Sequence, residues 1–196
     1  MSLRELRTFT LDRTSTGTNT AGGTRFRGHA AVFGERTWIP AGRGFYEEIT
    51  KGAFDRALEE DDVRFLLEHD PRWILGRSSA GTLRLSTDKR GLVVDADFPE
   101  TTYAKDVAVS LERGDLSQMS FAFSVREGGE EVSTLKDGST LRRLTDVSLS
   151  DVSVVAYPAY ESTDAALRAF EARCSEQVAA FHRQMKERLE AARKGR

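Results

Sequence analysis

The sequence has few of the features typical of secreted, membrane or nucleic-acid-binding proteins. Cys174 is the one cysteine among 196 residues, which excludes an internal disulfide and a cysteine-rich zinc site and favours a reducing compartment. The formal net charge is −2 with 31% charged residues, so there is no basic field for nucleic acid or an anionic membrane. Apolar runs of about 18 residues are absent, and the charged start MSLRELRTFTLDR is unlike a signal peptide. We expect a soluble intracellular protein without nucleic-acid or membrane partners.

Alternating apolar and polar residues predict a β-rich protein. Strand-like runs occupy residues 3–12, 25–33, 63–69, 82–98, 116–125 and 147–157. The first two are expected to pair as a hairpin around the polar linker 14–24. With six to eight strands and few helices, we predict an α+β fold built on a closed or nearly closed antiparallel β-barrel.

Helical spacing occurs in three places. Residues 51–60 and 101–113 carry apolar side chains four apart, and Gly114 is placed to end the second helix. The tail 163–196 differs in composition from residues 1–162, which divides the chain into two parts. The tail's apolar residues recur at steps of three and four, which predicts a long amphipathic helix over 164–193. That helix would either lie on its own barrel or bind a second copy of the chain or a scaffold protein.

A histidine, a serine and an aspartate lie on separate strand-like runs. They are His69 in FLLEHDP, Ser120 in GDLSQMSFAFSV and Asp151 in SLSDVSVVAYPA. A serine nucleophile needs an imidazole to take its proton and a third group to orient that imidazole. Alternation turns Ser120 away from the aromatic side chains of its strand. The three residues predict a serine hydrolase, although a histidine or serine in a strand is more often structural.

Other residues leave alternatives open. Asp146 competes with Asp151 as the third group, and each could instead be a sheet-edge charge. His29 fits a structural role in its strand, and His182 a solvated helix face. No GxSxG motif surrounds any serine, which argues against an α/β-hydrolase. Neither a metal motif nor a nucleotide motif occurs, so no cofactor and no metal are expected.

The order of motifs resembles the prohead (capsid maturation) protease family of HK97-like tailed phages. The resemblance spans about residues 25–162 and runs through the segments GHAAVFGE, EEITKGAFDRAL, VRFLLEHDPRWILGR, TLRLSTDKRGLVVDADFPET, ERGDLSQMSFAFSV and LSDVSVVAYPAY. It implies a herpesvirus-assemblin-like β-barrel serine protease in residues 1–162. His69 matches the family's histidine motif, Ser120 its nucleophile motif, and Asp151 the acidic residue of its last strand.

The resemblance also implies a substrate and a place of action. The enzyme would be a serine endopeptidase that cleaves the major capsid protein, its scaffold segment and itself, inside the immature capsid in the host cytoplasm. The oxyanion donors would come from backbone amides near Gly76 and Arg77 or from Arg142 and Arg143. Two other functions fit the residues: a non-catalytic capsid-assembly module that binds scaffold protein, and a hydrolase of small esters.

Overall fold

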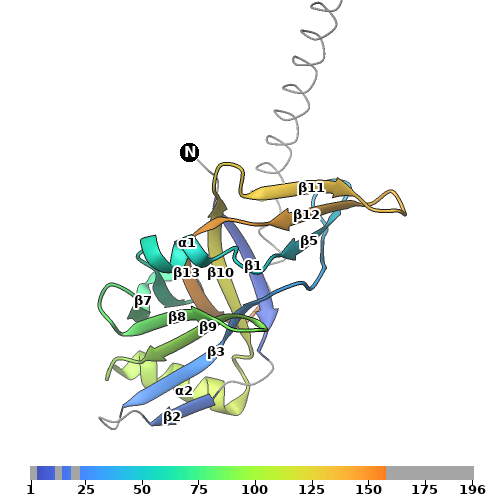
Figure 1. Ribbon diagram of the computed structural model, residues 1–196. Coiled ribbons are helices and arrows are strands. Elements are labelled where there is room, and N and C mark those ends of the chain that lie inside the picture. Colours follow the sequence, from blue (N-terminus) through green and yellow to red (C-terminus); the bar gives the residue numbers. More distant parts are fainter. Residues whose placement is uncertain (1–3, 12–14, 19–22, 158–196) are drawn as a thin grey trace, which may run out of the picture.

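The computed structural model describes residues 4–11, 15–18 and 23–157, which form a β-rich body with helices at its margin (Figure 1). The helix expected over 164–193 lies outside the described residues, as does His182. No helix within the described ranges is long and apolar enough to cross a membrane.

A five-stranded sheet forms the centre of the molecule. Its strand order is β1 (Glu5–Thr10), β10 (Gln118–Val125), β13 (Val147–Val155), β6 (Arg64–Leu67) and β7 (Asp70–Arg77). All neighbours are antiparallel except β13 and β6, which run parallel. The first strand therefore pairs with β10, and the expected hairpin with residues 25–33 is wrong.

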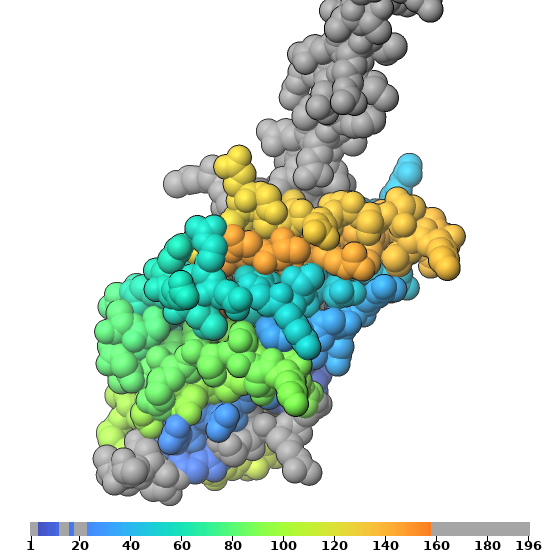
Figure 2. All heavy atoms as spheres, in the orientation of Figure 1, coloured from blue at the N-terminus to red at the C-terminus, as the bar shows by residue number. Residues whose placement is uncertain are grey.

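Two four-stranded sheets lie beside the central sheet. One has the order β2 (Ser15–Thr18), β3 (Thr24–Val32), β9 (Gly91–Asp97) and β8 (Leu83–Thr87). The other has the order β11 (Glu130–Thr134), β12 (Thr140–Leu144), β5 (Phe45–Ile49) and β4 (Thr37–Ile39). In Figure 2 the β11–β12 hairpin forms a band across one end of the molecule, next to β5.

This topology contradicts the expected antiparallel barrel. Among the described residues the strands form three separate sheets, each with two edges, so no sheet closes on itself. The pairs β12–β5 and β13–β6 are parallel, which needs crossovers that an up-and-down barrel lacks. The expectation of a β-rich protein with few helices is confirmed, but the described residues form 13 strands instead of six to eight, and the expectations of closure and purely antiparallel pairing are wrong.

Two helices are present in the described part of the chain. Helix α2 (Thr102–Arg113) buries Ala104, Val107 and Leu111 and ends at Gly114, whose φ of 82° is left-handed, as expected. Helix α1 (Asp55–Glu60) is shorter than the expected 51–60.

The apolar core fills the space between the sheets. Phe26 of β3 contacts Phe65 of β6, with ring centroids 5.1 Å apart, and Phe121 of β10 contacts Phe54 next to α1 at 5.5 Å. All four rings are fully buried. On β9, an inner strand of its sheet, hydrogen bonds from Arg25 and Arg84 lower the pKa of Asp95 to about 2.

A group of charged side chains is buried between β1 and the β11–β12–β5–β4 sheet. We call Glu5, Arg7, Glu47, Glu130 and Arg142 the buried ion cluster. Arg142 donates to Glu130 at 2.6 Å, to Glu5 at 2.7 Å and to Glu47 at 2.8 Å, and Arg7 donates to Glu5 and Glu47. Burial alone would lower the pKa of Arg142, but its hydrogen bonds to Glu5 and the charges of the surrounding carboxylates raise that pKa above its usual range. The cluster fixes β1 against the neighbouring sheet.

Candidate active site

Ser120 lies in the middle of β10, on the face opposite the aromatic layer. Met119, Phe121 and Phe123 of the same strand are fully buried in the core. Ser120 pairs across the sheet with Thr8 of β1 and Ser153 of β13. Directly opposed residues share a face of a sheet, so Ser120 and Ser153 point the same way. The prediction that Ser120 faces away from the phenylalanines is confirmed.

His69 lies in the two-residue turn between β6 and β7. Leu67 and Asp70 form the last pair of the two strands, so Glu68 and His69 make up the turn. Both have positive φ angles, 54° and 55°, as a type I′ hairpin turn requires. The turn directs the His69 ring to the face of the sheet that carries Ser120.

Asp151 reaches this face because β13 contains a bulge. Phe123 pairs with Leu149 and Ala122 pairs with Asp151, so Ser150 is an extra, unpaired residue. In a regular strand, Leu149 and Asp151 would point to the same face. The bulge instead leaves Leu149 in the core and turns Asp151 toward His69.

The three side chains form a continuous hydrogen-bonded chain. His69 Nε2 lies 2.7 Å from Ser120 Oγ, and His69 Nδ1 lies 2.6 Å from Asp151 Oδ1. Ser153 Oγ donates to Asp151 Oδ1 at 3.2 Å and accepts the His69 backbone N–H at 3.2 Å. Ser120 is fully buried, and the side chain of His69 is 13% exposed.

Arg4 forms an ion pair with the second oxygen of Asp151. Arg4 Nη2 donates to Asp151 Oδ2 at 2.5 Å, so the carboxylate binds His69 with one oxygen and Arg4 with the other. Asp70, next to His69 in the chain, is hydrogen-bonded to Arg72, which lowers the pKa of Asp70. Of these two carboxylates, Asp151 is the one that is hydrogen-bonded to the imidazole.

A pocket of about 370 Å³ opens beside His69 and Asp151. Arg4 and Arg64 supply its cationic groups, and Leu66, Pro71 and Ile74 supply its apolar walls. The pocket gives an extended peptide room to lie next to the His69 ring.

Several other residues considered from the sequence lie elsewhere. Asp146 accepts a hydrogen bond from Arg56 at 2.9 Å, before the start of β13, so Asp151 is the aspartate that contacts His69. His29, on β3, is hydrogen-bonded to Asp88, which is consistent with the structural role expected for His29.

Arg142 belongs to the buried ion cluster, and the Arg77 backbone N–H donates to Thr82. These two expected oxyanion donors are therefore engaged in other contacts.

Sequence reasoning missed Arg4 and Ser153. Ser153 lies two residues after Asp151, so period-two alternation places both on one face, and this signal was available in the sequence. Arg4 lies 147 residues from Asp151 in the chain. Their contact follows from the position of β1 beside β10, which no local pattern indicates.

Comparison with known proteins agrees with this arrangement. No curated protein matches the chain. The solved capsid assembly protease of bacteriophage T4 aligns with a TM-score of 0.52 over 78% of this chain and 97% of that chain, at 11% identity, which is a likeness of fold. The family model described as caudovirus prohead serine protease matches residues 10–177. Because that match covers most of the sequence, the chain belongs to the caudovirus prohead serine proteases.

Proposed function

We propose that Ser120, His69 and Asp151 are the catalytic triad of this serine protease. The observation that carries the proposal is the continuous chain of hydrogen bonds from Ser120 Oγ through the imidazole to Asp151, with both links under 3 Å. Nucleophile, base and orienting carboxylate are then each within hydrogen-bonding reach of the next.

The geometry supports a double-displacement mechanism. His69 Nε2 takes the Ser120 proton as Oγ attacks the peptide carbonyl, and the resulting imidazolium gives that proton to the leaving amine. For Nε2 to accept a proton, Nδ1 has to carry one, and Asp151 Oδ1 is placed to accept that hydrogen bond. The carboxylate also stabilises the imidazolium. Water then hydrolyses the acyl-enzyme by the same route.

We propose the capsid protein of the assembling phage head, with its scaffold segment, as the substrate. Support comes from the family description and from the fold shared with a capsid assembly protease. Cleavage would take place inside the prohead, in the host cytoplasm. We further propose that residues 1–162 carry the protease and that residues 163–196 are not needed for peptide-bond cleavage.

The test is mass spectrometry of the capsid protein encoded beside the protease after incubation with each variant. Wild-type protein is expected to yield defined fragments, and Ser120→Ala to lower their rate of formation by at least about a thousandfold. Ser124→Ala is the matched control, because Ser124 lies on the same strand and the same face but has no contact with His69 among the described residues. Fragments formed equally fast by Ser120→Ala and wild type would disprove the proposed triad.

A further inference from the structure

The turn that carries His69 has an unfavourable backbone conformation. Glu68 and His69 both lie in the left-handed region, which glycine and asparagine tolerate and other side chains rarely adopt. A pair of non-glycine residues in this region persists only when surrounding contacts hold it there.

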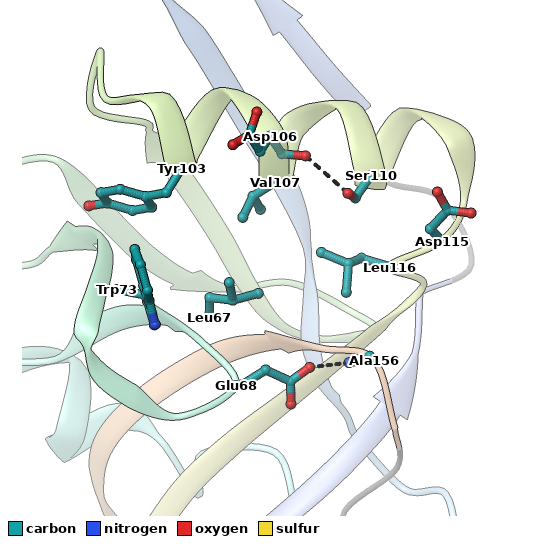
Figure 3. A pocket seen from close by; sticks show the side chains of 10 residues that line it. All are labelled: Leu67, Glu68, Trp73, Tyr103, Asp106, Val107, Ser110, Asp115, Leu116 and Ala156. Atoms are coloured by element: carbon teal, nitrogen blue, oxygen red, sulfur yellow. Dashed lines mark hydrogen bonds between the residues drawn. The ribbon is translucent and has the colours of Figure 1, made fainter.

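Strand β13 supplies those contacts. The Glu68 backbone N–H donates to Val154 O at 2.9 Å, and the His69 N–H donates to Ser153 Oγ at 3.2 Å. The Glu68 carboxylate accepts the backbone N–H of Ala156 through Oε1 at 2.5 Å. Figure 3 shows this side chain directed at Ala156, at the point where the chain leaves β13. These three hydrogen bonds therefore hold the turn against the strand that also carries Asp151.

The hydrogen bond from the Ala156 backbone N–H explains the position of the Glu68 side chain. Glu68 is exposed and lines a pocket of about 500 Å³ between α2 and the turn. The inward-pointing side chains around it in Figure 3 include Leu67, Val107 and Leu116, which are apolar. Within the described ranges, no cationic side chain pairs with Glu68. A charged acceptor makes a short, strong hydrogen bond to a backbone N–H, so the carboxylate is well suited to hold the turn.

We propose that Glu68 is a positioning residue for the reaction, acting through His69. Its carboxylate holds the left-handed turn against the end of β13, so that the His69 ring meets Ser120 and Asp151 at the same time. The inference rests on the proposed triad. Without the hydrogen bond to Ala156, the turn can relax toward ordinary φ angles, which displaces the His69 ring. A displacement of about 1 Å in a reacting group can cost about a hundredfold in rate.

The experiment compares three substitutions of Glu68 on a peptide that spans a cleavage site identified with wild-type protein. Glu68→Gln keeps an oxygen acceptor for Ala156, and we expect kcat within about threefold of wild type. Glu68→Ala removes the acceptor, and kcat should fall about tenfold to a hundredfold at unchanged KM. Glu68→Gly also removes the acceptor but tolerates the left-handed φ angle, so its kcat should lie between those of Glu68→Ala and wild type.

Asp106→Ala is the matched control, because Asp106 lines the same pocket and does not contact the turn in the described structure. Its kcat should equal that of wild type. The second readout is the NMR signals of the His69 ring nitrogens, which should shift in the Ala and Gly variants and stay in place in the Gln variant. Urea unfolding checks that all variants fold.

Two results would overturn the inference: Glu68→Ala as fast as wild type, or Glu68→Gln as slow as Glu68→Ala. Failure of the underlying function gives a different pattern. In that case Ser120→Ala cleaves the peptide as fast as wild type, or no variant cleaves at all, and the positioning role fails with the triad.

Discussion

Replacing Arg142 by methionine should destabilise the protein more than any exposed arginine substitution. Arg142 is completely buried and donates hydrogen bonds to Glu5, Glu47 and Glu130. Methionine has a similar length and no charge. The variant therefore removes the guanidinium that three carboxylates of the cluster bind, and Arg7 remains as a partner of Glu5 and Glu47.

The expected loss follows from the charges left behind. Removing one partner of a buried ion pair costs about 3–5 kcal/mol, because the remaining charge has lost its solvation and its counter-ion. The free energy of unfolding of an ordinary domain is about 5–15 kcal/mol, so the expected loss is a large fraction of the total stability. With a urea slope of about 2 kcal/mol per molar, the unfolding midpoint should fall by about 2 M.

Urea unfolding followed by circular dichroism measures this change, in the Ser120→Ala background so that the sample is not cleaved. Arg143→Met is the matched control, because its side chain is 37% exposed and lies 3.4 Å from Glu48. An exposed pair of this kind contributes less than about 1 kcal/mol. Equal midpoints for the Arg142 and Arg143 variants would refute the reasoning. Adding Glu5→Gln to Arg142→Met should recover part of the loss, because one of the carboxylates that lost its contact with Arg142 is then neutral.

Three further predictions concern single carboxylates and Arg4. Asp151→Asn should lower kcat about 10⁴-fold in the capsid-protein assay, by analogy with the loss of a triad aspartate, whereas Asp146→Asn should leave it unchanged; the reverse order would exchange their roles. Arg4→Ala should lower kcat about tenfold or less, because the ion pair with Asp151 is half exposed on the arginine side, and no change at all would contradict an orienting role. The pKa of Asp95 is lowered to about 2, chiefly by a hydrogen bond from Arg25, so the contribution of Asp95 to stability is present above about pH 4 and is lost as the pH falls toward 2. The thermal unfolding temperature of Asp95→Asn should therefore depend less on pH between about 4 and 2 than that of wild type. Identical pH profiles for the two proteins would contradict this prediction.

Local patterns predicted the elements of this fold well. The four-residue spacing from Tyr103 to Leu111 and the stop at Gly114 gave α2, because these features depend on neighbours along one helix. Strand alternation likewise gave the face on which Ser120 lies. Each of these depends on residues close in the sequence.

The pairing of the elements could not be predicted in the same way. Strand alternation indicates which face is buried but not which strand lies alongside, so β1 was paired with the wrong partner and the barrel was closed incorrectly. The contact of Arg4 with Asp151 depends on that pairing. The left-handed turn at His69 was hidden for another reason, because neither Glu68 nor His69 is a residue that normally marks such a turn.

The bulge in β13 makes Ser150 a residue that the strand accommodates and that the active site does not need. Apolar core positions fall on Val147 and Leu149 before it and on Val152 and Val154 after it, so the bulge shifts the alternation along the sequence by one residue and the strand buries the same face throughout. Exchanging Ser150 for another small residue leaves the count of residues unchanged. Deleting Ser150 would leave regular alternation from Leu149 through Asp151 to Val152, with Asp151 still on the face that carries Ser120. Loss of the bulge with Ser150 retained would instead turn Asp151 to the core face. The placement of Asp151 beside His69 therefore depends on the bulge taking up one extra residue, and not on Ser150 itself.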